Sequence, residues 1–247
     1  MSQKNKLLRD LEKDFGSKEL PTRIEVNGTV IFLRHCSAAL SIEDTSSWFI
    51  QQTIFPKLYF YTCHTGESEV ALGSLYSTDR FPEITIHENP YGLDPKLYGA
   101  MGYPENPDQF SVWREFPKSL FILPQVIVEK RAGLTEIHLW FVVARSEIYC
   151  PRDIVSMLRS ISSPVEGWAP RVTARSDLPS KEDWSKKIKR SLEYISTGKI
   201  EKIVLARQSS FTLENRVSIQ ALIAHLQKSS YGLSLIHISE PTRLGMI

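Results

Sequence analysis

Paired segments of strand-forming residues between positions 21 and about 144 constrain the fold more than any other feature of this sequence. In each pair, two runs rich in branched and aromatic residues flank a short turn-forming stretch. The three pairs are residues 23–33 around Asn27-Gly28, residues 56–61 with 68–74, and residues 121–129 with 136–143. Asn-Gly is the strongest short hairpin signal, because both residues tolerate a positive φ. The first half of the chain is therefore predicted to be an antiparallel, β-rich assembly.

Helical periodicity borders this region on both sides. Leu7, Leu8, Leu11 and Phe15 recur at helical spacing, which predicts an amphipathic helix that ends at Gly16. Residues 151–162 are also predicted to be helical. Between the strand pairs, aromatic residues beside glycine or proline at 98–103 and 113–117 predict tight turns packed under a sheet.

A change in pattern after residue 162 predicts a subdomain boundary. Residues 163–179 have the composition of a linker, with three prolines and a glycine. Ser180 can then cap a helix that carries an apolar face and ends at Gly198. Residues 199–207 predict a strand, and residues 218–228 predict a second amphipathic helix.

The segment after Gly232 does not continue this pattern. Residues 233–243 match one translated reading frame of a transposon-end sequencing adapter, and residues 244–247 are interpreted as index sequence. The alternative is a genuine short β-tail. We therefore expect a truncated protein with three parts: a β-rich N-terminal subdomain (1–165), the start of a second domain (166–232) and a non-native tail (233–247).

Composition excludes several classes of function. The chain has 247 residues, 42% of them hydrophobic, and its net charge of +2 gives no reason to expect a nucleic-acid or anionic-membrane partner. The sequence shows no run resembling a membrane-spanning helix and no signal peptide, so a cytoplasmic location is expected. Cys36, Cys63 and Cys150 are predicted to be buried free thiols, and the scattered histidines predict no metal site.

Lys202 is the candidate catalytic residue. The strand predicted at 199–207 places it among aliphatic residues, where a lysine is unusual unless it is exposed or functional. Partial burial would lower its pKa and make the neutral amine available as a general base. The alternative is a lysine on a solvated or edge face, where its charge discourages aggregation.

Two motifs resemble segments of the chorismate-utilising enzymes, in particular of their isochorismate synthase branch. Trp184 and the run GKIEKIVLAR at 198–207 are similar to the W…I..G…EKVVLAR segment that opens the family's catalytic half. The runs WREFP at 113–117 and FILP at 121–124 resemble the family's upstream W..FP…F.LP segment. The resemblance implies an α+β, chorismate-utilising-enzyme-like fold with large antiparallel sheets and flanking helices, incomplete in this chain. It identifies residues 166–232 as the start of the chorismate-binding catalytic domain.

The resemblance also implies a reaction. Isochorismate synthase, an isomerase feeding menaquinone or siderophore synthesis, adds water at C2 of chorismate while the C4 hydroxyl leaves. Mg²⁺ held by glutamates anchors the substrate carboxylate. Lys202 would deprotonate the water, since relatives that use ammonia carry glutamine instead. The acid and the magnesium-binding glutamates belong to the family's C-terminal half, so this chain is expected to hold no metal or cofactor ligands and to be inactive.

Two other functions stay open. Salicylate synthase adds a pyruvate-elimination step, and a non-catalytic β-rich binding module would need no catalytic lysine. Chorismate is the expected small-molecule partner, and the sequence indicates no obligate protein partner. Glu201, Arg207 and His225 are expected to be structural. The chain is also expected to be marginally folded, with an edge strand and the apolar face of the 218–228 helix exposed.

Overall fold

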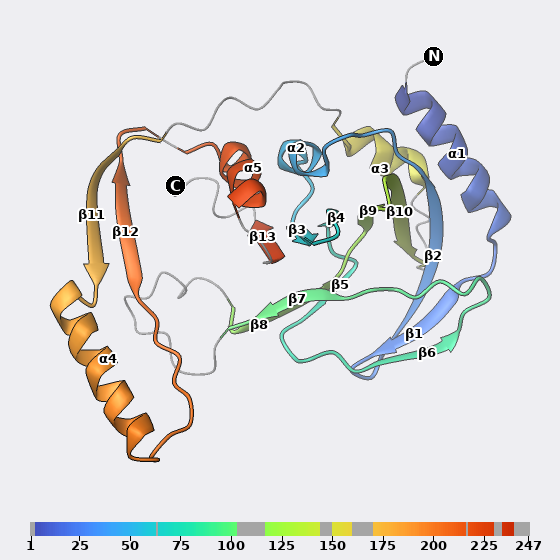
Figure 1. Cartoon of the computed structure of the whole chain (residues 1–247). Helices are drawn as coiled ribbons and strands as arrows, with labels where there is room; N and C mark the ends of the chain where they lie inside the picture. The colour runs from blue at the N-terminus through green and yellow to red at the C-terminus, as the bar shows by residue number, and fades with distance from the viewer. Residues whose placement is uncertain are drawn as a thin grey trace. The chain divides into compact units, whose positions relative to one another are not determined.

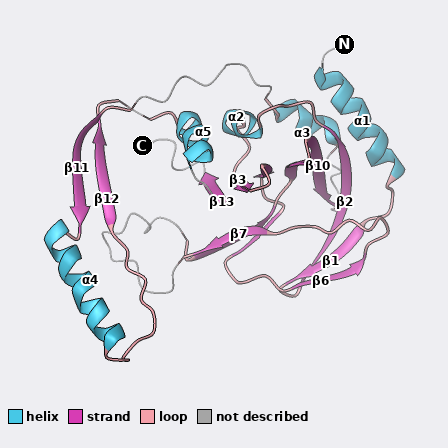
Figure 2. Ribbon diagram, viewed as in Figure 1, coloured by secondary structure: helices cyan, strands magenta, loops and turns pink. Residues whose placement is uncertain are grey.

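A computed structural model describes residues 3–62, 64–102, 117–143, 150–159, 170–215, 217–229 and 234–239. The chain divides into two compact units, one containing residues 1–165 and 223–247 and the other residues 166–222. Figures 1 and 2 show their helices and strands. The assignment of residues 1–165 and 166–232 to separate functional domains stays a prediction.

The larger unit contains an eight-stranded antiparallel sheet and a three-stranded antiparallel sheet. The large sheet comprises β1 (Thr22–Val26), β2 (Thr29–Ala39), β3 (Lys57–Thr62), β4 (Glu67–Leu72), β6 (Ile84–Glu88), β9 (Val126–Arg131), β10 (Leu134–Val142) and β13 (Ser234–Ser239), in the spatial order β13-β3-β4-β9-β10-β2-β1-β6. The small sheet has the order β5 (Tyr76–Thr78), β8 (Ser119–Leu123), β7 (Tyr98–Met101). The predicted α+β class, with a large antiparallel sheet and flanking helices, is confirmed.

Three hairpins build most of the large sheet, and all three were predicted: β1–β2, β3–β4 and β9–β10. Asn27 and Gly28 have φ of 49° and 83°, as their two-residue turn requires. The prediction that residues 121–129 form one strand is wrong. Strand β8 ends before Pro124, and the chain continues as β9 in the large sheet. A continuous central strand is disfavoured here because proline lacks the N–H that such a strand would donate.

The two faces of the large sheet are covered differently. On one face, buried side chains from six strands pack against Tyr98, Ile122 and Leu123 of the small sheet. Trp140 belongs to this cluster, whereas the next residue, Phe141, meets Phe15 of α1 (Gln3–Ser17) with ring centroids 5.1 Å apart. Since successive strand residues point to opposite faces, the helices cover the second face. Figure 1 shows α1 beside α3 (Pro151–Met157) there.

The small sheet corrects one sequence prediction. The part of residues 98–103 that the structure describes contains strand β7, not a tight turn, because β8 supplies a partner. Tyr98 is buried, as expected. Gly99 is required for this pairing, since a Cβ there would lie 2.3 Å from the carbonyl oxygen of Leu120. The aromatic residues at 113–116 lie outside the described residues.

The helices of the larger unit agree in part with the sequence. The predicted N-terminal helix is confirmed as α1, with Leu11 buried, but α3 ends at Met157 rather than at residue 162. Helix α2 (Thr45–Gln51) was not predicted. The carbonyls of Ile50 and Gln52, at the end of this helix, accept hydrogen bonds from the buried ammonium of Lys57. Burial lowers the pKa of Lys57 to about 8. No helix among the described ranges is long and apolar enough to cross a membrane.

The smaller unit consists of α4 (Lys181–Ser196) and the antiparallel pair β11 (Val172–Leu178) and β12 (Gln208–Leu213). Ser180 caps α4, with its Oγ accepting from the backbone N–H of Asp183 at 3.2 Å, and Gly198 follows the helix with a φ of 69°. Both ends were predicted. The prediction of a linker at 163–179 is wrong for residues 172–178, because β12 provides a partner that composition does not reveal.

Helix α5 (Ile219–Ser229) confirms the predicted second helix. Ile223 is 2% exposed, and the Nε2 of Gln227 donates to the Oη of Tyr59 at 2.6 Å. The expectation that the whole apolar face of this helix is exposed is therefore wrong at Ile223. Residues 234–239 form β13 beside β3, and the non-native origin of segment 233–247 stays a prediction.

The cysteines differ in burial. Cys36 is a buried free thiol, as predicted, and burial raises its pKa to about 12. Cys150 is also free but only half-buried. Cys63 lies outside the described residues.

Candidate functional site

Lys202 lies in the segment 199–207, which connects α4 to β12. The end of α4 is closed by backbone hydrogen bonds from Gly198 to Ile195 and from Lys199 to Tyr194, both at 3.0 Å. The strand predicted here is wrong: residues 199–207 have no strand structure, and no described strand pairs with them. A strand needs a neighbour to satisfy its N–H and C=O groups, and an apolar run does not supply one by itself.

The side chain of Lys202 is exposed. In the parts of the chain that the structure describes, no hydrogen bond or ion pair engages its ammonium. The neighbouring Val204 is 82% exposed, and Glu201 and His225 are exposed as well. The described residues therefore leave the side chain of Lys202 in contact with solvent, and its role as a base stays a prediction.

Other side chains of the smaller unit make local contacts. The guanidinium of Arg207 lies 5.9 Å from the ring centroid of Trp184, at the separation of a cation–π contact. Asp177 accepts hydrogen bonds from Ser209 (2.5 Å) and Arg175 (3.1 Å), and these bonds hold the pKa of its carboxyl below the usual range. These contacts link β11 with β12, and α4 with the residue just before β12; the structural role of Arg207 stays a prediction.

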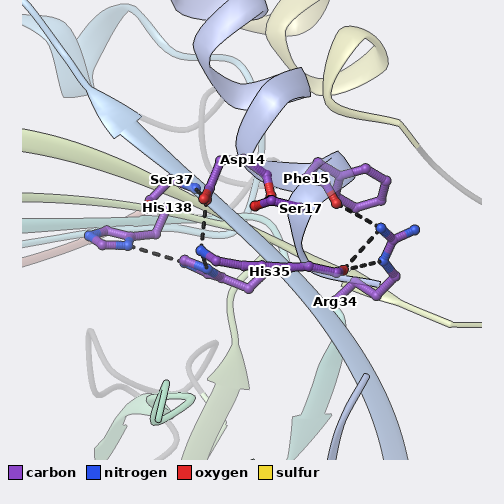
Figure 3. Close-up of polar contacts among 8 residues, drawn as sticks. Asp14, Phe15, Ser17, Arg34, His35, Ser37 and His138 are labelled. Atoms are coloured by element: carbon purple, nitrogen blue, oxygen red, sulfur yellow. Dashed lines mark hydrogen bonds and ion pairs between the residues drawn. The ribbon is translucent and has the colours of Figure 1, made fainter. Parts of the chain in front are cut away.

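The larger unit contains a buried histidine pair that residue spacing does not reveal. Strand pairing sets His35 of β2 opposite Trp140 of β10, and His138 of β10 opposite Ser37 of β2. The two imidazoles are thus diagonal neighbours on one face of the sheet, with the Nε2 of His35 3.2 Å from the Nδ1 of His138 (Figure 3). His35 is 3% exposed. The antiparallel register alone brings together residues 103 positions apart.

Lys18 fixes the direction of the hydrogen bond between these imidazoles. Its ammonium can only donate and lies 3.5 Å from the Nδ1 of His35, so this Nδ1 accepts and the Nε2 of His35 donates to His138. Asp14 accepts from Lys18 and from the backbone N–H of Ser37, both at 2.7 Å. Burial acts to raise the pKa of Asp14, but these hydrogen bonds outweigh it and lower the pKa.

Burial keeps both imidazoles uncharged near neutral pH. It lowers the pKa of His35 from 6.5 to about 3, and the neighbouring His138 and Lys18 add to the effect. Burial also lowers the pKa of His138. Because His35 is sealed from solvent and both of its ring nitrogens are engaged, the pair holds the end of α1 on the sheet rather than exchanging protons with a ligand.

A second polar cluster is charge-balanced. Lys96 and Arg131 both pair with Glu69, at 3.3 and 2.6 Å, and both also pair with Glu129. The hydroxyl of Tyr98 donates to Glu69 at 2.8 Å. Every charge in this cluster has an opposite partner, so the cluster fastens the chain around Tyr98 to β4 and β9.

The magnesium site that the resemblance implies does not fit these residues. Among the described positions, no group of three or more His, Cys, Asp or Glu side chains could hold a metal ion. Glu69 and Glu129 are already paired with cations.

The fold and sequence match known proteins. A family model described as chorismate binding enzyme matches residues 77–241. The isochorismate synthase MenF of Escherichia coli (strain K12) is 23% identical over 190 residues, which cover 73% of this chain and 40% of that protein. The solved structure of MenF, the menaquinone-specific isochorismate synthase from Escherichia coli, has a similar fold, with a TM-score of 0.64 at 17% identity. The match covers 96% of this chain and 52% of that one. The chain thus spans about half of these relatives or less, and the family model, which matches most of its length, shows that it belongs to the chorismate-binding enzymes.

Proposed function

We propose that this chain is a fragment of an isochorismate synthase, which adds water at C2 of chorismate while the C4 hydroxyl leaves. The match of residues 77–241 to the chorismate-binding family carries the proposal, and the MenF-like fold supports it. A lysine at position 202 favours water over ammonia as the nucleophile. In the proposed reaction Lys202 takes the proton from the attacking water, and an acid outside this chain protonates the leaving hydroxyl.

Lys202 can act as a base only after its surroundings change. It is exposed in an irregular segment, next to the exposed Ile203 and Val204. Covering this segment would remove water from the ammonium and favour the neutral amine. We propose that the cover, the acid and the magnesium-binding glutamates all come from sequence outside this chain. A base without these groups lacks transition-state stabilisation, so the fragment alone is expected to be inactive.

The first test is made on the gene. Reading the source DNA across the codon for Gly232 with an adapter-free method is expected to show an open frame that continues into glutamate-rich sequence. The complete product and the fragment 1–232 are then each incubated with chorismate and Mg²⁺, and the products are separated chromatographically. Isochorismate is expected from the complete protein and not from the fragment.

Substitution in the complete protein tests the base. Lys202→Ala is expected to lower kcat at least about 100-fold, because it removes the proton acceptor. Lys199→Ala removes an exposed lysine from the same segment and is expected to leave kcat unchanged. Salicylate and pyruvate as products would instead favour a salicylate synthase. A frame that stops after Ile247 would contradict the proposal and favour a binding module. A fully active Lys202→Ala enzyme would contradict the role of Lys202 as the base.

A further inference from the structure

A cavity of about 240 Å³ lies in the larger unit, where α1, α2, α3 and the connection from β2 to α2 meet. Figure 1 shows these helices on one side of the large sheet. The apolar part of its wall is formed by Leu7, Leu40, Ile42, Trp48, Val155 and Leu158. The rest of the wall combines charged side chains with the uncharged residues Gln3, Ala39 and Ser41. An apolar wall with a few convergent polar groups is typical of a small-molecule site.

Buried hydrogen bonds hold this wall in place. The side chain of Gln52 is buried, and its Nε2 donates to the carbonyl of Arg159 while its Oε1 accepts from the N–H of Arg159, both at 2.9 Å. The ammonium of Lys4 donates to the carbonyls of Ser156 (3.3 Å) and Leu158 (3.1 Å), which fastens the start of α1 to the end of α3. The cavity is therefore preformed, and a ligand need not order its walls.

The charged part of the wall is positive. Among the described residues of the wall, Lys4, Lys6 and Arg159 stand against one carboxylate, Asp10. Lys4 is occupied by the carbonyls of α3. Within the described residues, no hydrogen bond or ion pair engages the side chains of Lys6 and Arg159. These two cations are free to bind an anion.

The cavity volume sets the size of that anion. An apolar cavity of about 150 Å³ is sufficient for benzene, and pockets for drug-sized ligands begin near 300 Å³. A volume of about 240 Å³ therefore suits one six-membered ring with a small charged substituent. A carboxylate matches the planar donor fork of Arg159 and the point charge of Lys6.

We propose that this cavity binds a monocyclic carboxylate, with the ring against Trp48 and Leu158 and the carboxylate between Lys6 and Arg159. Burial of the ring and charge-assisted hydrogen bonds to the carboxylate both favour the complex. The site does not contain Lys202, and the inference does not depend on the proposed reaction.

Sodium benzoate is the probe, and benzamide is its neutral control. Both are titrated against the whole chain at low ionic strength by ligand-observed NMR. Benzoate is expected to saturate with a Kd on the order of 1 mM, and benzamide to bind at least about fivefold more weakly. Lys6→Gln/Arg159→Gln is expected to weaken benzoate binding about tenfold and leave benzamide unchanged, because it removes only the charge contribution. Lys13→Gln, on α1 but outside the cavity wall, is expected to bind benzoate normally.

A filling substitution makes the test independent of charge. Leu7→Trp is expected to abolish binding of both probes, because the larger side chain occupies the cavity.

Lys6 and Arg159 are exposed, so their substitution is expected to leave the circular dichroism melt unchanged. Three results would each overturn the proposal: no saturable benzoate binding up to about 20 mM, equal affinity for benzoate and benzamide, or unchanged benzoate affinity in the double variant.

Discussion

Acid is expected to destabilise the larger unit through His35. The folded protein holds this imidazole neutral, with a pKa of about 3, whereas the unfolded chain has the ordinary value of 6.5. Between these values the unfolded state binds more protons than the folded state, so the free energy of unfolding falls as the pH falls. The stability from this residue is fully present above pH 6.5 and is lost progressively toward pH 3.

The size of the effect follows from this difference. Each pH unit below the unfolded-state pKa lowers the free energy of unfolding by about 1.4 kcal/mol. At pH 5, about 1.5 units below that pKa, the free energy of unfolding is therefore lower by about 2 kcal/mol. Because pH 5 lies well above the folded-state pKa, this figure depends almost entirely on the unfolded chain. His138, whose pKa is also lowered, adds a loss in the same direction.

His35→Gln is the matching perturbation. The glutamine amide can still donate toward His138 and accept from Lys18, but it does not titrate. Urea unfolding at pH 7.5 and pH 5, followed by far-ultraviolet circular dichroism, is expected to show a loss about 2 kcal/mol smaller in this variant than in the unmodified chain.

His87→Gln serves as the control. His87 is not part of the His35–His138 pair. It pairs with Glu25 on the exposed side of β1 and β6. Its substitution is expected to leave the contribution of His35 intact. If His35→Gln and the unmodified chain lose the same free energy of unfolding between pH 7.5 and pH 5, the assignment of the acid sensitivity to His35 is refuted.

Gly99→Ala is expected to destabilise the protein by about 1–3 kcal/mol in urea unfolding, because the added Cβ meets a carbonyl oxygen and an aromatic ring across the β7–β8 pair. Gly16→Ala, with nothing near its Cβ, is expected to be neutral or stabilising, and equal effects of the two substitutions would contradict this reasoning. The purified chain is also expected to bind an apolar-surface dye, because Leu178 is 70% exposed and Val204 lies almost fully in solvent. Leu178→Lys/Val204→Lys is expected to reduce the dye signal without lowering the melting temperature; no dye binding by the unmodified chain would count against exposed apolar surface.

Local chemistry was sufficient to predict the hairpins. The Asn27-Gly28 turn requires two residues with positive φ and occurs between runs of suitable pattern, so its signal does not depend on distant parts of the chain. Helix α4 was predicted for the same reason, because Ser180 and Gly198 mark its two ends within the local sequence. Where turn and cap residues agree with periodicity, sequence alone predicts an element.

Partner-dependent elements could not be predicted in this way. Strand β11 has the composition of a linker and becomes a strand only because β12 pairs with it. The segment around Lys202 has the composition of a buried strand but lacks a described neighbour. Apolar content therefore predicts that a segment needs burial, but not whether this chain provides the partner.

In the candidate sites as well, features set by local sequence were predicted, whereas features that depend on distant partners were not. The motif containing Lys202 was found from sequence, whereas the choice between a buried and an exposed side chain was left open there. The histidine pair was missed because His35 and His138 meet only through the register of β2 and β10. The cavity between the helices was missed as well, since α2, which contributes Trp48, has no clear periodic signal.

The order of strands in the large sheet has a consequence for synthesis. The hairpin β9–β10 lies between β3–β4 and β1–β2, although it follows both in the chain. As the protein leaves the ribosome, the first two hairpins have no edge in common and must wait, each with an unpaired edge, until residue 142 has emerged. The nascent chain thus exposes strand edges until its last central hairpin arrives. This interval is when contact with a chaperone would be most valuable to the cell.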